Sequence, residues 1–162
     1  MTLCTAWALV SCGKTSDVVY VKDYLTDEML KTDAYPAIRA AIEQCVANGG
    51  GTLVLPGGTL PVKRDFCFER YIYVSNNEHG LFRIAFDFDG IENLTIEGNN
   101  TLLLFTGFIS PFYFNNCRNV LVKDLSIAYT RPFNAPGTIM ATGKGWLGAK
   151  FPDDYSVTSC SV

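Results

Sequence analysis

The stretch IENLTIEG at residues 91–98 is followed, 26 residues further along the chain, by the similar stretch CRNVLVKD at residues 117–124. This internal repeat decides the fold that we predict. A second apolar segment comes after each copy, Leu102 to Phe105 in one case and Leu125 to Tyr129 in the other. A period of twenty-odd residues made of short alternating strands is typical of a solenoid whose successive turns stack their strands in parallel.

We therefore predict a mainly β protein, a right-handed parallel β-helix with an N-terminal capping α-helix. Side chains alternate along a strand, so one set of the repeat residues points into the shared core and the other points outward. The inward set is Leu94, Ile96, Val120 and Val122, and the outward set is Thr95, Leu121 and Lys123. Asn93 and Asn119 are expected to stack at one corner, where a left-handed residue with a hydrogen-bonding side chain suits the bend.

The capping helix is predicted just after Asp33, whose side chain is expected to accept bonds from the first free amides, with Pro36 in the first turn. Arg39 and Glu43 form a pair on the outer face, and the three glycines at 49–51 end the helix. Apolar residues recur at helical spacing, namely Ala34, Ile38, Ala41, Ile42, Cys45 and Val46. A helix in this place covers the open first turn of a β-helix.

Strands are predicted at 52–56 and 59–62, with a glycine turn between them. The alternative fold, a β-sandwich or jelly roll, requires hairpins with tight Asn-Gly or Asp-Gly turns. Apart from Asn48-Gly49 at the end of the predicted helix, only Asp89-Gly90 qualifies, which favours the β-helix.

Composition limits the class of protein. The chain has 162 residues, of which 48% are hydrophobic and 18% charged, so it holds one packed domain and is not disordered. Its net charge of −3 argues against nucleic acid as a partner. The apolar runs fall short of the roughly 20 residues that a membrane-spanning helix needs.

The amino terminus resembles a bacterial lipoprotein signal, because residues 9–12 read LVSC after a mostly apolar stretch. On this interpretation Cys12 is lipidated, residues 1–17 are a signal segment and tether, and the protein is exported to the cell envelope. A lipid on Cys12 is then its only link to a membrane. The alternative is an ordinary apolar strand with an incidental cysteine.

The six cysteines contain no CxxC pair and no histidine at metal spacing, so we predict neither a metal site nor a cofactor. Disulfides among Cys45, Cys67, Cys117 and Cys160 are conceivable in an exported protein. Because Cys45 and Cys117 fall at positions expected to be buried, free thiols acting as small hydrophobic side chains are favoured.

Asp87 and Asp89 lie two residues apart in a strand and project from the same face. Such a pair suits general acid and base roles or calcium binding. The competing interpretation, which we favour, is a solvated strand face.

Arg131 and Tyr129 are candidate substrate-binding residues, because an arginine beside an aromatic ring suits sugar recognition through hydrogen bonds and stacking. His79, the only histidine, lies in a polar turn where it is able to bond a sugar hydroxyl, although a surface role competes. Trp146 is a further stacking candidate that we place in a loop.

Several stretches together resemble the amino-terminal part of the α-1,3-galactosidases of glycoside hydrolase family 110. The helix and GGGTLVLPGGT of residues 33–62 are similar to the entry of pectate-lyase-superfamily β-helix enzymes. The more specific stretches are SNNEHGLFRIAF at 75–86, LFTGFISPF at 104–112 and DLSIAYTRPF at 124–133. The resemblance covers roughly residues 27–140.

The resemblance implies hydrolysis of terminal α-1,3-linked galactose from an oligosaccharide or glycan, with inversion and without a metal. Such a reaction needs a carboxylic acid and a carboxylate roughly 6.5–9.5 Å apart. In the family these act from later turns that have no counterpart here, so the catalytic residues of this chain stay unknown and the fragment alone is expected to be inactive.

The chain is accordingly divided into residues 1–17, residues 18–140 with the helix and first turns of the β-helix, and an irregular, truncated tail at 141–162. Two alternative functions stay open. One is a pectate-type polysaccharide lyase, and the other is a non-catalytic glycan-binding or vestigial β-helix fragment.

Overall fold

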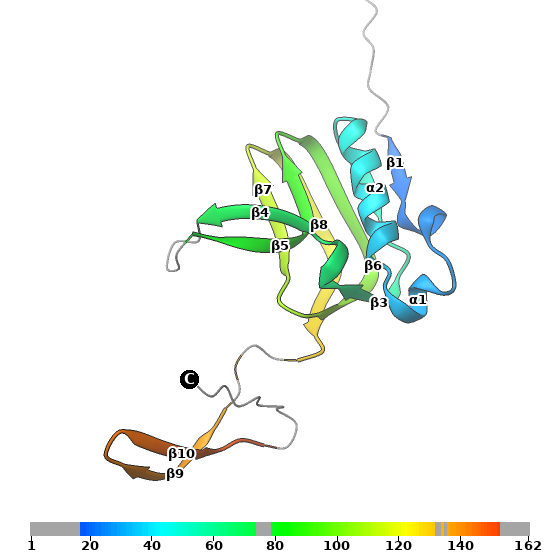
Figure 1. Ribbon diagram of the computed structural model, residues 1–162. Helices are drawn as coiled ribbons and strands as arrows, with labels where there is room; N and C mark the ends of the chain where they lie inside the picture. The colour runs from blue at the N-terminus through cyan, green and yellow to red at the C-terminus, as the bar shows by residue number, and fades with distance from the viewer. Residues whose placement is uncertain (1–16, 74–78, 132–133, 135, 153–162) are drawn as a thin grey trace, which may run out of the picture.

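The computed structural model describes residues 17–73, 79–131, 134 and 136–152 (Figure 1). These residues are mainly β, as predicted, with one long helix. In chain order the elements are β1 (Val18–Tyr20), η1 (Val21–Tyr24), α1 (Met29–Thr32), α2 (Tyr35–Ala47), β2 (Gly51–Val54), β3 (Gly58–Lys63), η2 (Arg64–Phe66), β4 (Phe68–Tyr73), β5 (His79–Asp89), β6 (Glu92–Thr106), β7 (Ser110–Asn115), β8 (Arg118–Tyr129), β9 (Thr138–Gly143) and β10 (Trp146–Lys150).

Parallel pairing dominates the body of the molecule. A five-stranded sheet runs in the order β1-β2-β6-β3, with β8 also paired to β6, and every pair in it is parallel. A three-stranded sheet has the order β4-β5-β7, in which β5 and β7 are parallel and β4 and β5 form an antiparallel hairpin. We call β2 with β3 the first tier, β5 with β6 the second tier, and β7 with β8 the third tier.

The register between the second and third tiers confirms the predicted repeat. Glu92 pairs with Arg118 and Leu94 with Val120, an offset of 26 residues. The same offset joins β5 to β7, where Phe88 lies opposite Phe114. Between the first and second tiers the offset is 43, from Thr52 to Thr95, because the β4–β5 hairpin is inserted there.

The predicted asparagine corner is also confirmed. Asn93 and Asn119 adopt left-handed backbone conformations with φ of 57° and 55°. The side-chain amide of Asn119 donates to Oδ1 of Asn93 over 2.7 Å. An asparagine tolerates this conformation better than most residues, and its amide joins one tier to the next.

Helix α2 begins as the sequence indicates. The backbone N–H of Tyr35 donates to Asp33 Oδ1 over 3.0 Å, and Pro36 lies in the first turn, where it costs no helical hydrogen bond. Arg39 and Glu43 pair on the outer face at 2.9 Å. Past the helix, the glycines at 49–51 all have positive φ, which residues with a Cβ adopt at a cost.

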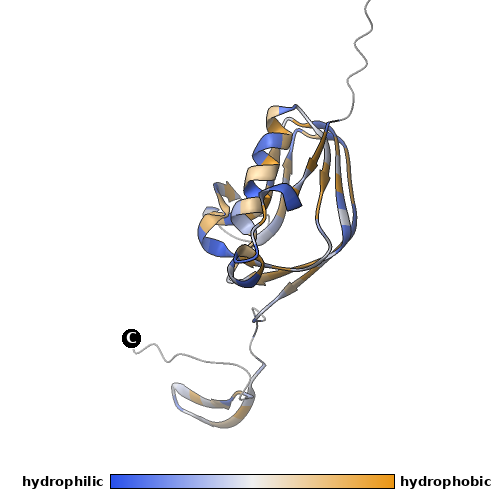
Figure 2. Ribbon diagram, turned by 90° about the vertical axis from the view of Figure 1, so that its right-hand side faces the viewer, coloured by the Kyte–Doolittle hydropathy of each residue, from blue (hydrophilic) through white to orange (hydrophobic). Residues whose placement is uncertain are grey.

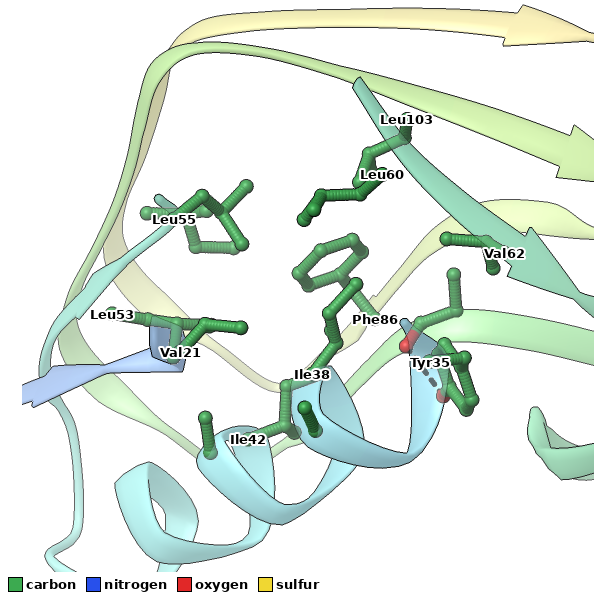
Figure 3. Packing of buried hydrophobic residues seen from close by; sticks show 14 of the residues in the cluster. Val21, Tyr35, Ile38, Ile42, Leu53, Leu55, Leu60, Val62, Phe86 and Leu103 are labelled. Carbon is green, nitrogen blue, oxygen red and sulfur yellow. Dashed lines mark hydrogen bonds between the residues drawn. The ribbon is translucent and has the colours of Figure 1, made fainter. Parts of the chain in front are cut away.

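The apolar face of α2 packs on the tiers. Figure 3 shows Ile38 and Ile42 directed into a cluster with Leu53, Leu60 and Phe86, all buried. Figure 2 shows that α2 contains both hydrophilic and hydrophobic residues, while many residues of the strands are hydrophobic. The prediction for Val46 is wrong, since its side chain is 40% exposed beyond the edge of this contact.

Burial within the repeat depends on the tier. Leu94 and Ile96 of the second tier are buried, as predicted, because β6 has neighbours on both edges. Val120 and Val122 of the third tier also pack against the core, but they are only partly buried. Among the described strands, only β6 pairs with β8, so these inward side chains are covered from one direction.

The tail is more regular than predicted as far as the structure describes it. Strands β9 and β10 form an antiparallel hairpin in which Trp146 pairs with Gly143. The expectation of an irregular segment from residue 141 is therefore wrong up to Lys150, and so is the loop expected around Trp146, which begins β10 and is 58% exposed. The tight turn at Lys144-Gly145, where Gly145 has φ of 82°, permits this hairpin.

The predictions for residues 1–16, including the lipidated Cys12, and for the last ten residues lie outside the described part of the chain. Within that part, every helix is too short or too polar to cross a membrane.

Candidate functional site

A group of polar side chains gathers where β4, β5 and β7 meet. Phe86 and Phe88 of β5 are buried, so the alternation of the strand turns Asp87 and Asp89 to the opposite side. In β7, Tyr113 lies in register with Asp87, and Asn115 with Asp89. Arg70 of β4 reaches this group with its side chain. We call these residues the polar cluster; its members are Arg70, Asp87, Asp89, Tyr113 and Asn115.

Arg70 organises the polar cluster. Its Nε donates to both carboxylate oxygens of Asp87, over 2.7 and 2.8 Å. Its Nη1 is 3.5 Å from Oδ2 of Asp89, while the amide of Asn115 donates to Oδ1 of the same carboxylate over 2.9 Å. The guanidinium carbon lies 4.8 Å from the centroid of the Tyr113 ring, a cation–π contact.

Arg70 and Asp87 form an ion pair that is also hydrogen-bonded. The hydrogen bond to Asp87 is the main cause of a raised pKa of Arg70. The Asp87 side chain is 11% exposed and that of Asp89 is 43% exposed. The favoured prediction of a solvated strand face is therefore correct for Asp89 and wrong for Asp87, because Arg70 folds over the Asp87 carboxylate.

This arrangement suits recognition of hydroxyl groups better than proton transfer. Both oxygens of Asp87 accept from Nε of Arg70, so this carboxylate is committed to an ion pair with a guanidinium and is not held ready to exchange a proton with a substrate. Calcium requires six to eight oxygen ligands, and in the polar cluster a guanidinium stands between the two carboxylates. The half-exposed Asp89 instead offers an acceptor beside the donors of Arg70 and Asn115.

His79 lies at the start of β5, opposite Tyr73 of β4. Its ring is parallel to that of Tyr71, with 6.0 Å between the centroids, and is tilted against that of Tyr73 at 5.1 Å. The only histidine of the chain thus belongs to an aromatic group on the β4–β5 hairpin.

Tyr129 and Arg131 lie elsewhere. Tyr129, at the end of β8, donates its hydroxyl to the carbonyl oxygen of Ile109 over 2.8 Å, and its ring meets Phe105 edge to face. Burial raises the pKa of this hydroxyl. Arg131 follows β8 and is exposed. The structure therefore does not bring these two candidates together with His79, since β8 and β5 belong to different sheets.

The described cysteines are free thiols, as favoured from the sequence. Cys45 and Cys67 are buried, and burial raises the pKa of Cys45 to about 11 and that of Cys67 to about 12. Cys117, predicted to be buried, is only partly so because it lies in the third tier.

The sequence analysis missed Arg70, Tyr71, Tyr73 and Tyr113. Tyr71 and Tyr73 do carry a signal, since two tyrosines separated by one residue share a face of any strand. Arg70 and Tyr113 carry none, because their meeting with Asp87 depends on how three strands are brought together.

The known proteins to which this chain is similar in sequence are named alpha-1,3-galactosidases. No protein-family model matches the chain. It is 28% identical over 148 residues to a protein named alpha-1,3-galactosidase B from Bacteroides thetaiotaomicron, covering 89% of this chain and 24% of that relative. It is 27% identical to alpha-1,3-galactosidase A from Shewanella woodyi, over 76% of this chain and 21% of the relative.

A third relative, alpha-1,3-galactosidase B from Akkermansia muciniphila, is 26% identical over 85% of this chain and 18% of its own length. The chain thus spans about a fifth to a quarter of the length of these curated relatives. The predicted relationship to the α-1,3-galactosidases is confirmed, and at a coarse level it supports a glycoside hydrolase function.

Proposed function

We propose that this chain is the amino-terminal part of an exported glycoside hydrolase that removes terminal α-1,3-linked galactose from glycans. The observation that carries the proposal is the similarity, over most of this chain, to several proteins named alpha-1,3-galactosidase. The substrate is an oligosaccharide or glycan.

The architecture that we propose is the start of a right-handed parallel β-helix. Three observations support it: parallel pairing between successive tiers, the 26-residue register, and the hydrogen bond between Asn93 and Asn119. Crossovers between parallel strands of one sheet are right-handed in nearly all proteins, which supports the handedness. Helix α2, packed on β1, β2 and β3, is then the lid of the first tier.

The mechanism that we propose is inversion by two carboxyl groups, one protonating the leaving oxygen and one activating water. We place this catalytic pair on turns of the protein other than the three tiers. The ion pair of Asp87 with Arg70 supports this placement, because it commits that carboxylate to a guanidinium within the protein. The polar cluster contributes by binding hydroxyl groups of the glycan.

The test measures binding of the disaccharide galactosyl-α-1,3-galactose to the whole chain by saturation-transfer NMR. The α-1,4-linked isomer serves as a competitor. We expect binding without release of galactose. Asp89→Asn, which removes the exposed charge of the polar cluster, is expected to weaken binding several-fold. Glu43→Gln on the outer face of α2 is the matched control, and we expect it to bind like the wild type.

Two outcomes would contradict the proposal in different ways. Failure of the wild-type chain to bind either disaccharide would remove support for galactoside recognition. Release of galactose would place the catalytic pair within this chain and refute our placement on other turns.

We propose in addition that the protein is a lipoprotein of the cell envelope, anchored through Cys12. The LVSC stretch at residues 9–12 supports this proposal. Expression in a bacterial host with a labelled fatty acid tests it. Label should enter the wild-type protein and not the Cys12→Ser variant, and equal labelling of both would refute the anchor.

A further inference from the structure

The β4–β5 hairpin presents one face on which aromatic side chains collect. Its register places Glu69 opposite Arg83, Tyr71 opposite Leu81, and Tyr73 opposite His79. Because directly opposed residues share a face and residues two apart along a strand do too, all six side chains lie on one side of the hairpin. We call Tyr71, Tyr73, His79 and Leu81 the aromatic face.

This face is open to solvent. The exposed fractions are 72% for Tyr71, 62% for Tyr73 and 60% for Leu81. Figure 1 shows the hairpin extending sideways from the stacked tiers. Large apolar side chains gathered on an exposed surface often mark a binding site, since they contribute little to folding there.

The hairpin is held at its base and does not depend on the aromatic face for its position. Arg83 forms an ion pair with Glu69, and its Nη1 donates to the carbonyl oxygen of Asp65 over 3.3 Å. From α2, Arg39 donates to the carbonyl oxygen of Phe66 over 3.0 Å and lies over the Phe68 ring. These contacts hold the base of the hairpin in place, and the His79 ring packs beside those of Tyr71 and Tyr73, so part of the entropic cost of binding is met before any ligand arrives.

The size of the face favours a small ligand over a protein. A stable protein interface buries about 800 Å² on each partner. A fully buried aromatic side chain covers at most about 250 Å². The three rings and Leu81 offer less than this area, because Tyr71, Tyr73 and Leu81 are only 72%, 62% and 60% exposed.

The chemistry of the rings indicates which small ligand fits. Tyrosine and histidine present flat carbon surfaces with polar atoms at their edges. A galactose ring matches such a surface, because its axial 4-hydroxyl leaves the hydrogens H3, H4 and H5 together on one apolar side, with hydroxyls around the rim. Stacking of that side on a tyrosine ring removes apolar area from water while the rim hydroxyls remain hydrogen-bonded.

We propose that the aromatic face is a galactose-stacking site, separate from the polar cluster, that holds a galactosyl residue of the glycan. The proposal rests on the proposed function for the class of sugar. Tyr71 and Tyr73 supply the stacking surface, and His79 lies at its border, where its ring nitrogens reach a sugar hydroxyl.

The experiment uses the whole chain with methyl α-galactopyranoside and the α-1,3-linked disaccharide. His79 is the only histidine, so its Hε1 resonance is an NMR signal that is assigned without further work and reports on this face. We expect saturating sugar to shift that signal, and saturation transfer to be strongest at H3, H4 and H5. Tyr71→Ala and Tyr73→Ala should each weaken binding at least fivefold, while Tyr71→Phe, which keeps the ring, should bind within twofold of the wild type.

Leu121→Ala is the control, because Leu121 is an exposed apolar side chain on β8, which belongs to the other sheet and lies outside the aromatic face. We expect its binding to stay within twofold of the wild type, with unchanged circular dichroism in every variant. If the wild type binds the disaccharide while the tyrosine variants bind equally well and the His79 signal is unmoved, this inference fails and the proposed function stands. If the wild type binds no galactoside, both fail. Self-association that Tyr71→Ala abolishes would identify a protein interface and overturn the inference.

Discussion

The second and third tiers carry the same pattern of side chains and differ in what covers them. Phe88 and Ile96 of the second tier are fully buried, while the matching Phe114 of the third tier is 40% exposed and Val122 only partly buried. Strand β6 has partners on both edges, and the described part of the chain provides β8 with only β6. The burial of a residue in these strands thus depends on whether a neighbouring strand lies on both sides of it, because each repeat contacts only its neighbours.

The difference in burial between the two tiers is tested most strongly by removing the matching phenylalanine ring from each of them. Phe88→Ala is expected to lower the free energy of unfolding by about 3–5 kcal/mol, because it leaves a cavity in a packed core. Phe114→Ala should cost about 1 kcal/mol, since much of that ring already faces water. Urea unfolding followed by circular dichroism measures both, and equal losses would contradict the difference between the tiers.

A second prediction concerns the pH dependence of stability that the buried thiols of Cys45 and Cys67 cause. Burial raises the pKa of the Cys45 and Cys67 thiols to about 11 and about 12, above the ordinary value of 9.0. Their folded-state pKa is raised, so the stability that they contribute is present below pH 9 and is lost as the pH rises, when the unfolded chain ionises first. We expect a fall of roughly 2 kcal/mol between pH 8 and 10.

Denaturant unfolding in a reducing buffer at several pH values checks this prediction. The double variant Cys45→Ala, Cys67→Ala should show a flatter dependence on pH. Val62→Ala is the control, because it weakens the same core without removing an ionisable group, and it should keep the wild-type slope. An unchanged slope in the double variant would rule out these thiols as the source.

A smaller loss is expected at the corner that joins the two tiers. Asn93→Ala removes the acceptor of the Asn119 amide and places a Cβ residue of low left-handed preference at φ 57°. The expected cost is about 1–2 kcal/mol. Asn93→Gly loses the same hydrogen bond but not the backbone preference, so it should cost less than Asn93→Ala. The reverse order in thermal or urea unfolding would show that the left-handed conformation is not the source of the cost.

The least effect is expected from the ion pair on the surface between the tiers. Arg118 and Glu92 approach to 3.8 Å, with their side chains 82% and 57% exposed. Exposed pairs of this kind contribute about 0–1 kcal/mol. Arg118→Ala should leave the midpoint of urea unfolding unchanged within error, and a clear loss would mean that surface charges help to hold the third tier in register.

Much of the fold could be predicted because its signals are local. The repeat, the helix after Asp33 and the glycines at 49–51 all depend on residues close together in the chain. The β4–β5 hairpin inside the first repeat, and the hairpin of β9 and β10, were not predicted. Strands β4, FERYIY, and β9, TIMATG, do not alternate cleanly between apolar and polar residues, and β9 is exposed along its whole length.

The candidate site was predicted less well than the fold. Asp87 and Asp89 were identified as a pair because residues two apart share a strand face, but Arg70 comes from a strand that is 17 residues away from Asp87 in sequence. Tyr129 looked like a sugar contact beside Arg131, yet its hydroxyl bonds to the backbone of Ile109. Residues that are close in the sequence could be grouped correctly, but contacts between residues on different strands of the sheet could not be predicted from the sequence.

The sequence by itself determined the 26-residue period, the residues that point inward, the corner asparagines and the start of helix α2. Each of these follows from backbone geometry and side-chain alternation over a few residues. The tertiary structure alone decided how deeply each tier is buried, that Arg70 folds over Asp87, and that His79 joins Tyr71 and Tyr73 on one open face. These features depend on which strands become neighbours, and a long-range contact of that kind leaves no periodic trace in the chain.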